Sequence, residues 1–168
     1  EILAKAIDWA ISHKIDILTY SQAAIKKEYK PILNAALDRA HRAGIITVFI
    51  HTGHPGNIMP TGLWPGKDDG READVNIYHY DYSTVPIAEY QKMRNGEKTW
   101  WNPPFLSVSS TSPVLGGIVA MMRSIKPTMG AKECRSILQE TSFPYTFEGE
   151  RAPHAVDAFA ALKKTIEK

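Results

Sequence analysis

Residues 28–50, EYKPILNAALDRAHRAGIITVFI, carry a helix pattern, a glycine and a strand pattern in direct succession. The part from about Glu28 to Ala43 has the spacing of an amphipathic helix, and Pro31 is tolerated near its first turn, where a missing amide loses no partner. Gly44 is typical of the residue that follows a helix. Residues 45–50 are mostly apolar and β-branched, which predicts a buried strand.

A similar unit precedes this one. Apolar residues recur at helical spacing over residues 2–13, and residues 16–20 form a short run with strand composition. Helices that alternate with strands are typical of a parallel sheet covered by helices. The sequence therefore predicts a three-layer α/β fold.

The remainder is less regular before it returns to helices. Repeated Gly and Pro predict loops over residues 52–74, residues 75–82 predict another strand, and the polar and aromatic residues 92–104 predict a surface excursion. Three helices are expected, at residues 112–125, 131–140 and 154–166. The first is apolar around most of its circumference, which predicts a central, buried helix.

Composition excludes several classes of protein. The 168 residues are 43% hydrophobic and 23% charged with a formal net charge of +2, which suits one globular domain and gives no case for nucleic-acid binding. No apolar stretch is long enough to span a bilayer. The single cysteine, Cys134, excludes an internal disulfide. The chain begins inside an expected helix without a methionine, so we expect it to be a fragment of a longer protein.

The stretch Ser107–Gly117, SVSSTSPVLGG, places hydroxyl groups just before the expected central helix. The positive end of a helix stabilises negative charge that develops beside a serine oxygen. Ordinary helix capping requires the same residue types, because Ser and Thr are favoured N-caps and Pro is common in the first turn. This stretch alone leaves both interpretations open.

The same stretch resembles the nucleophile motif of the subtilisin-like serine peptidases (subtilases), Gly-Thr-Ser-Met-Ala-Ser-Pro-His-Val-Ala-Gly. The alignment puts Ser109 on the nucleophile, Pro113 on the proline and Gly117 on the last glycine. Weaker matches to other subtilase segments follow in the correct order along the chain, at residues 7–10, 16–21, 35–50, 52–56 and 138–142.

The resemblance implies that residues 1–168 are the C-terminal part of a single subtilisin-like domain. The family's catalytic Asp and His precede the matched region, so they would belong to a missing N-terminal portion of the same domain. A serine hydroxyl is a weak nucleophile without a base, and we therefore expect this chain alone to be inactive. Peptide or protein substrate would lie along Ser21, Gln22, Ala23 and Ala24, near Gly53. The resemblance also suggests secretion or a cell-surface location.

Several positions depart from the family pattern. The asparagine that supplies an oxyanion donor is replaced by His54, or by Gly53 in an ungapped alignment, and Asn57 is a further candidate donor. Ser107-Val108 stands in place of Gly-Thr, and alanines replace the two glycines of the substrate strand. These changes narrow the expected cleft and alter the expected active site.

We expect no metal site and no other cofactor. The resemblance allows Ca²⁺, and Asp68, Asp69, Gly70, Glu72 and Asp74 could supply oxygen ligands, but their spacing favours a solvated turn.

Three alternatives remain open. The related sedolisins share this fold, but the aspartate expected at their oxyanion position is absent. A catalytically inactive, subtilase-like binding or structural module would explain the altered positions. An α/β domain that binds a phosphorylated small molecule at the helix after Ser112 is the third, although a glycine-rich phosphate loop is lacking.

Overall fold

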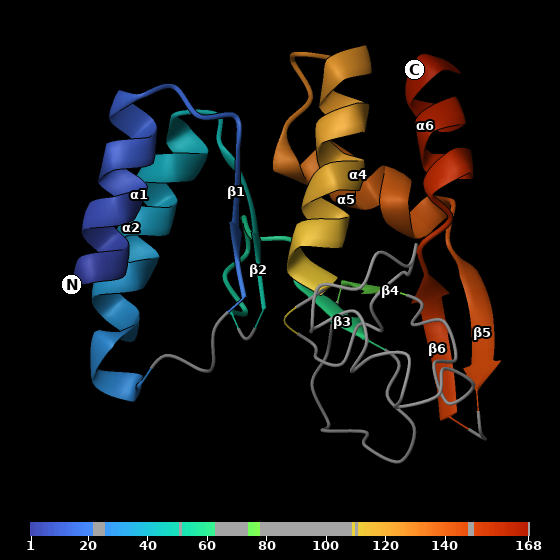
Figure 1. Ribbon diagram of the computed structural model, residues 1–168, viewed down its shortest axis with the longest axis horizontal. Helices are drawn as coiled ribbons and strands as arrows, with labels where there is room; N and C mark the ends of the chain where they lie inside the picture. The colour runs from blue at the N-terminus through green and yellow to red at the C-terminus, as the bar shows by residue number, and fades with distance from the viewer. Residues whose placement is uncertain are drawn as a thin grey trace, which may run out of the picture.

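The computed structural model describes residues 1–21, 26–50, 52–62, 74–77, 109, 111–147 and 150–167 (Figure 1). Within this part of the chain, helices and strands form a mixed α/β fold. The helices are α1 (Ile2–Ser12), the short 3-10 helix η1 (Lys27–Tyr29), α2 (Lys30–Arg42), α4 (Thr111–Ile125), α5 (Ala131–Glu140) and α6 (Ala158–Glu167). The strands are β1 (Ile17–Tyr20), β2 (Ile46–Phe49), β3 (Pro60–Gly62), β4 (Val75–Ile77), β5 (Phe143–Phe147) and β6 (Glu150–Ala155).

The parallel pair β1–β2 organises one half of the molecule. Ile17 lies opposite Ile46 and Tyr20 opposite Phe49, as the alternation of helices and strands predicted. Helices α1 and α2 lie on one side of the pair and α4 on the other (Figure 1). Gly44 ends the α2 unit with a φ of +83°, a conformation that favours glycine.

The chain continues from β2 to the next parallel partner through a very short connection. Asn57 forms a parallel bridge with Thr47, and the Ile58 amide donates to the Thr47 carbonyl at 2.9 Å. Only seven positions of sequence separate Phe49, the last residue of β2, from Asn57, whereas a parallel connection usually needs a dozen or more residues. We call residues 52–59 the β2–β3 connection. It leads into β3, a strand within the region predicted to be irregular.

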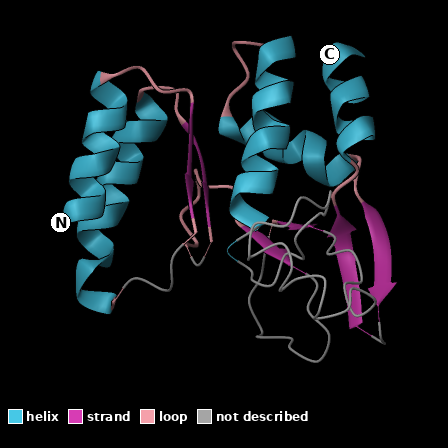
Figure 2. Ribbon diagram, viewed as in Figure 1, coloured by secondary structure: helices cyan, strands magenta, loops and turns pink. Residues whose placement is uncertain are grey.

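Beyond β3 the strand order is β3–β4–β6–β5, with β3, β4 and β6 parallel and β5 antiparallel to β6. The predicted helix at residues 154–166 is therefore wrong at its start, because His154 and Ala155 belong to β6. The helix begins later because Asp157 caps it: its Oδ1 accepts from the Ala160 amide at 2.9 Å. Figure 2 shows the β5–β6 hairpin beside α5 and α6. The predicted strand at residues 75–82 is described only over β4.

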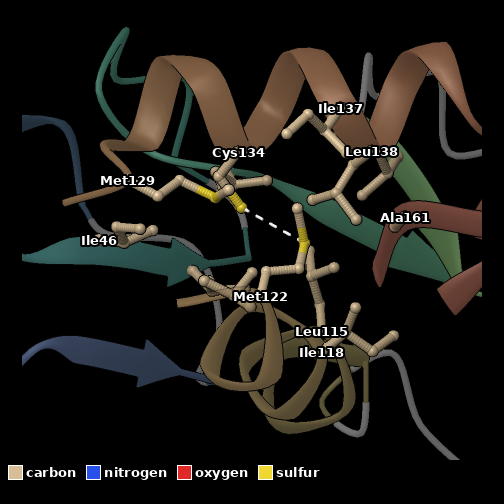
Figure 3. Packing of buried hydrophobic residues seen from close by; sticks show 13 residues of the cluster. Ile46, Leu115, Ile118, Met122, Met129, Cys134, Ile137, Leu138 and Ala161 are labelled. Carbon is tan, nitrogen blue, oxygen red and sulfur yellow. Dashed lines mark hydrogen bonds between the residues drawn. The ribbon is translucent and has the colours of Figure 1, made fainter. Parts of the chain in front are cut away.

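Two hydrophobic clusters stabilise the fold. One lies between α1, α2 and the β1–β2 pair and includes Ile7, Leu37 and Phe49. The other joins α4, α5 and α6 to the strands, and Figure 3 shows Cys134 and Met122 in contact within it. Burial raises the pKa of the Cys134 thiol to about 12, so this cysteine acts as a neutral core residue.

Helix α4 is buried along one face only. Leu115, Val119 and Met122 are fully buried, whereas Met121 and Ile125 remain 46% and 40% exposed, so the burial predicted around most of the circumference is not found at these two residues. No helix in the described ranges has both the length and the apolar character needed to cross a bilayer.

Candidate active site

Ser109 lies at the carboxyl end of the β1–β2 pair. Its hydroxyl donates to the main-chain carbonyl of Ser21 at 2.8 Å, and Ser21 directly follows β1. Ser109 is half-buried and precedes the first residue of α4 by two positions. The contact brings together two residues that the sequence analysis assigned to one site, the candidate nucleophile and the first residue of the candidate substrate strand.

The start of α4 is fixed to β2 as well. The Ser112 hydroxyl donates to the Val48 carbonyl at 2.5 Å, so two serines three residues apart attach the start of this helix to consecutive strands. Thr111 and Ser112 are fully buried, which does not favour a phosphate site at these residues. A hydroxyl beside the positive end of α4 is well placed to carry developing negative charge.

Close packing between α4 and β1 depends on Gly116. A Cβ at this position would lie 2.4 Å from Thr19 Cγ2, whereas a Cβ at Gly117 would meet nothing within 4 Å. The glycine that lets α4 approach the sheet is therefore Gly116, one residue before the glycine that the motif alignment singled out.

His54 lies against α2. Its Nδ1 accepts from the Gly56 amide at 3.2 Å, which puts the proton of a neutral ring on Nε2, and Nε2 lies 3.2 Å from Asp38 Oδ1. The N–H of a neutral His54 is thus directed at Asp38. An oxyanion role for His54 stays a prediction, and it would require the ring to leave Asp38.

Asn57 is 1% exposed, and its amide group is fully engaged in holding the β2–β3 connection. Its Oδ1 accepts from the Phe49 amide at 2.9 Å, and its Nδ2 donates to the carbonyls of Phe49 at 3.0 Å and Thr52 at 3.1 Å. Both hydrogens of the amide nitrogen are used in these contacts. As the connection stands, Asn57 has a structural role and offers no donor to a substrate.

His41 packs beside His54, with ring centroids 5.0 Å apart, and its Nε2 lies 2.9 Å from Thr47 Oγ1. Burial lowers the pKa of His41 to about 4, with a further lowering from the nearby His54 that Asp38 opposes. His41 is therefore neutral at ordinary pH. Sequence reasoning did not single it out, and nothing in the local pattern marks it.

Arg135 on α5 holds the other side of the β2–β3 connection. Its Nη2 donates to the carbonyls of Pro55, at 2.8 Å, and Asn57. Its Nε lies 3.2 Å from Asp74 Oδ1, close enough for an ion pair although not aligned for a hydrogen bond. Asp74, which the sequence analysis assigned to a solvated turn, is instead a partly buried member of this network.

Other candidate residues lie outside the described ranges. These are Gln22, Ala23 and Ala24 of the substrate strand, Ser107-Val108, and the possible calcium ligands Asp68, Asp69, Gly70 and Glu72. Gly53 is described and exposed, with nothing within 4 Å of where a Cβ would be. Within the described ranges, no group of three or more His, Cys, Asp or Glu side chains is arranged to hold a metal ion.

The fold is similar to that of solved subtilisin-related proteases. Fervidolysin from Fervidobacterium pennivorans, described as a keratinolytic enzyme related to subtilisin, matches 95% of this chain at 17% identity with a TM-score of 0.59. The prenylagaramide maturation protease PagA matches 99% at 14% identity with a TM-score of 0.62. A protease from Pseudoalteromonas arctica matches 96% at 17% identity with a TM-score of 0.63.

This chain spans 28% of the fervidolysin chain, 67% of PagA and 57% of the Pseudoalteromonas protease. No protein-family model matches the chain, and no curated protein matches it in sequence. At these identities the likeness establishes the fold: a subtilisin-like α/β architecture with a parallel sheet and covering helices.

Proposed function

We propose that this chain is the C-terminal part of a subtilisin-like serine peptidase domain in which Ser109 is the nucleophile. The observation that supports this most strongly is the contact between the Ser109 hydroxyl and the Ser21 carbonyl at the carboxyl end of β1. It joins the candidate nucleophile to the candidate substrate strand across 88 positions of sequence. The likeness to subtilisin-related proteases supports the proposal at the level of the fold.

The proposed reaction is hydrolysis of a peptide bond in a peptide or protein that lies beside Ser21. Ser109 Oγ attacks the carbonyl carbon while a histidine base takes the hydroxyl proton. The same histidine then returns this proton to the departing amine, and a water molecule hydrolyses the acyl-enzyme. We propose that the histidine and its aspartate partner come from a portion of the protein that precedes these 168 residues, so this chain alone is inactive.

Peptide cleavage by the full-length protein tests the proposal. Ser109→Ala should abolish cleavage, because the variant lacks the hydroxyl that forms the proposed acyl-enzyme. Ser124→Ala is the matched control: Ser124 is an exposed serine on α4 whose hydroxyl donates to the Met121 carbonyl at 2.7 Å. A Ser109→Ala protein that cleaves as fast as the Ser124→Ala control would refute the assignment of the nucleophile.

A non-catalytic binding or structural module of the same fold is the second candidate. The contact between His54 Nε2 and Asp38 favours it, because the N–H expected to face an oxyanion is directed at α2 instead. This candidate predicts that the folded full-length protein, immobilised on a column, retains a peptide and does not cleave it. Replacement of Asp38 by Asn would then leave peptide retention unchanged.

A further inference from the structure

Strands β1 and β2 are similar in composition but differ in burial. All four residues of β2 are buried, whereas those of β1 are half-buried and Thr19 is exposed. Within the part of the chain that the structure describes, β1 pairs with β2 only, so its other edge is open. Soluble proteins commonly protect an open edge with charged side chains or proline, and β1 contains neither.

The open edge presents backbone groups that β2 does not reach. The Asp16 and Tyr20 carbonyls accept from amides at the start of β2 and just after its end, so the even-numbered residues of this segment face β2. Successive residues of a strand in a parallel pair direct their backbone groups to alternate edges. The N–H and C=O groups of Ile17 and Thr19 therefore face the open edge.

The candidate nucleophile lies on the same side of β1. Ser21 continues the series of Ile17 and Thr19, and its carbonyl accepts from the Ser109 hydroxyl at 2.8 Å. A segment that paired with the open edge of β1 would therefore end beside Ser109.

Helix α4 exposes an uncharged face next to this edge. Gly116 packs on Thr19 of β1, and Ala120, one turn later on the same side of the helix, is exposed. None of the exposed residues of α4 is charged, and the hydroxyl of exposed Ser124 donates within the helix. The exposed residues of α1, α2, α5 and α6 each include charged side chains. An uncharged outer face that includes Met121 is typical of a helix in a protein interior.

The two features together define the kind of occupant. Backbone donors and acceptors along a strand edge are matched by another strand, and an uncharged helix face is matched by an apolar segment. A peptide substrate held beside Ser21 would leave the face of α4 uncovered. Proteins of similar fold contain more chain, because these 168 residues span only 67% of PagA and 57% of the Pseudoalteromonas protease.

We propose that the open edge of β1, together with Ala120, Met121 and Ile125 of α4, is a docking surface for the portion of the protein that precedes these residues. We call it the β1–α4 surface. The preceding portion supplies a strand beside β1 and an apolar segment over α4. Helices lie on both faces of the β1–β2 pair (Figure 1), so we expect the added strand to be a run of about four to eight mostly apolar residues.

This inference rests on the proposed function, which assigns the base to the same preceding portion. Docking on the β1–α4 surface would bring that portion beside Ser109, where the proposed reaction needs a base.

Amide-resolved hydrogen exchange of the full-length protein tests the backbone part of the surface. Leu18 faces β2, whereas Ile17 and Thr19 face the open edge, so the three amides compare the two edges of one strand. The proposal predicts that all three exchange at rates within about 10-fold of each other. If Ile17 and Thr19 exchange faster than Leu18 by more than that, β1 is an edge in the full-length protein and the proposal is wrong.

A pair of matched variants tests the part on α4. Ala120→Lys adds a charge to the β1–α4 surface, and Ala35→Lys adds the same charge at an exposed alanine of α2. A covered ammonium group is costly, so Ala120→Lys should displace the preceding portion. Exchange at Ile17 and Thr19 should then accelerate by about 100-fold or more while Leu18 stays protected, and fluorophosphonate labelling of Ser109 should slow by about 100-fold or more.

Ala35→Lys should change neither the exchange rates nor the labelling rate. Equal results for the two variants would show that α4 is not covered at Ala120 and would overturn the proposed surface. If Ala120→Lys does not fold, the exchange rates of the unmodified protein still decide the question.

The remaining outcomes separate this inference from the proposed function. Labelling of Ser109 in a protein whose Ile17 and Thr19 amides exchange rapidly would overturn the surface and leave the proposed function in place. Protected amides without labelling would overturn the proposed reaction and support the surface. Protection that is lost on dilution, with a dimeric mass by light scattering, would identify a second copy of the chain as the occupant and overturn the assignment to the preceding portion.

Discussion

The segment that leads into α4 lies at the carboxyl end of the parallel pair, whereas the β2–β3 connection turns back along β2 until Asn57 lies opposite Thr47, and the contacts of the two segments differ. Ser109 and Ser112 donate to the carbonyls of the two strands, which leaves the candidate nucleophile at the carboxyl end of β1. In the β2–β3 connection, His54 and Asn57 direct their side chains at α2 and at the connection itself. The candidate nucleophile therefore lies at the carboxyl end of β1, whereas the candidate oxyanion residues contact α2 and the connection itself.

The difference follows from the length of the connection. With only residues 50–56 available to cross from β2 to its parallel neighbour, the chain must turn back at once, and Asn57 reaches a position opposite Thr47. A side chain that closes such a turn is not available to a substrate. Any stabilisation of an oxyanion here would come from a group other than the engaged Asn57 amide.

The largest effect that tests this comparison is expected at Asn57. Replacing Asn57 with Ala removes three hydrogen bonds and leaves the buried amide of Phe49 unpaired, so we expect a loss of about 3 kcal/mol in the free energy of unfolding. Urea denaturation measures this change. The control is Asn34→Ala, an exposed position on α2, where the change should stay within about 0.5 kcal/mol. A similarly small loss at Asn57 would contradict its structural role.

The second prediction tests how closely α4, the helix that follows Ser109, packs on β1. Gly116→Ala would place a methyl group 2.4 Å from Thr19 Cγ2, so α4 must shift away from β1 and we expect a net loss of about 1–2 kcal/mol. Gly117→Ala adds the same methyl group in open space and should stabilise the helix by about 0.5–1 kcal/mol. Thermal unfolding of both variants would reveal opposite shifts. Equal shifts would show that α4 does not pack closely on β1 at Gly116.

The smallest effect concerns the pH dependence of the oxyanion side. The pKa of His41 falls from 6.5 to about 4 on folding. Between pH 6.5 and pH 4, His41 therefore binds a proton in the unfolded chain but not in the folded chain. Stability contributed by His41 is present above about pH 6.5 and is lost as the pH falls toward 4. Because His41 is only half-buried, we expect the loss to be about 1 kcal/mol.

The comparison for His41 is the unfolding free energy at pH 7 and pH 4.5 in His41→Gln and His13→Gln. His41→Gln should lose less stability on acidification than the unmodified protein does. His13→Gln, at the exposed histidine that follows α1, should lose as much as the unmodified protein. The groups that face His41 are His54, Asp38 and Arg135, and all three are retained in both variants. If His41→Gln lost as much stability between pH 7 and pH 4.5 as the unmodified protein, the loss of stability in acid would have to come from another group.

The sequence was sufficient to predict the elements with strong local signals. The helix–Gly–strand unit of residues 28–50 and the helix at residues 131–140 needed only periodicity, a glycine after the helix and β-branched residues. The β5–β6 hairpin was missed because residues 143–153 were assigned no element and His154 and Ala155 were assigned to the final helix, although Asp157 is a typical N-cap residue and marks where that helix starts.

In the candidate site, too, some residues could be found from sequence motifs and others could not. Ser109 and Ser21 were assigned to one site from motifs that follow the family order, and the structure places the two residues in contact, while their roles stay predictions. The Arg135–Asp74 pair could not be predicted, because the two residues lie far apart in sequence and each has an ordinary surface pattern locally. The position of His54 against Asp38 likewise depends on how the connection folds back on α2, which no local pattern encodes.

The most direct test of the central claim is to label the full-length protein with a fluorophosphonate and to locate the adduct by peptide mass spectrometry, with Ser109→Ala as the control. The account predicts an adduct on Ser109 that disappears in the variant, because the serine at the start of α4 reacts once a base is supplied. No adduct in a folded full-length protein would contradict catalysis by Ser109. The shared fold would then reflect ancestry or a binding role.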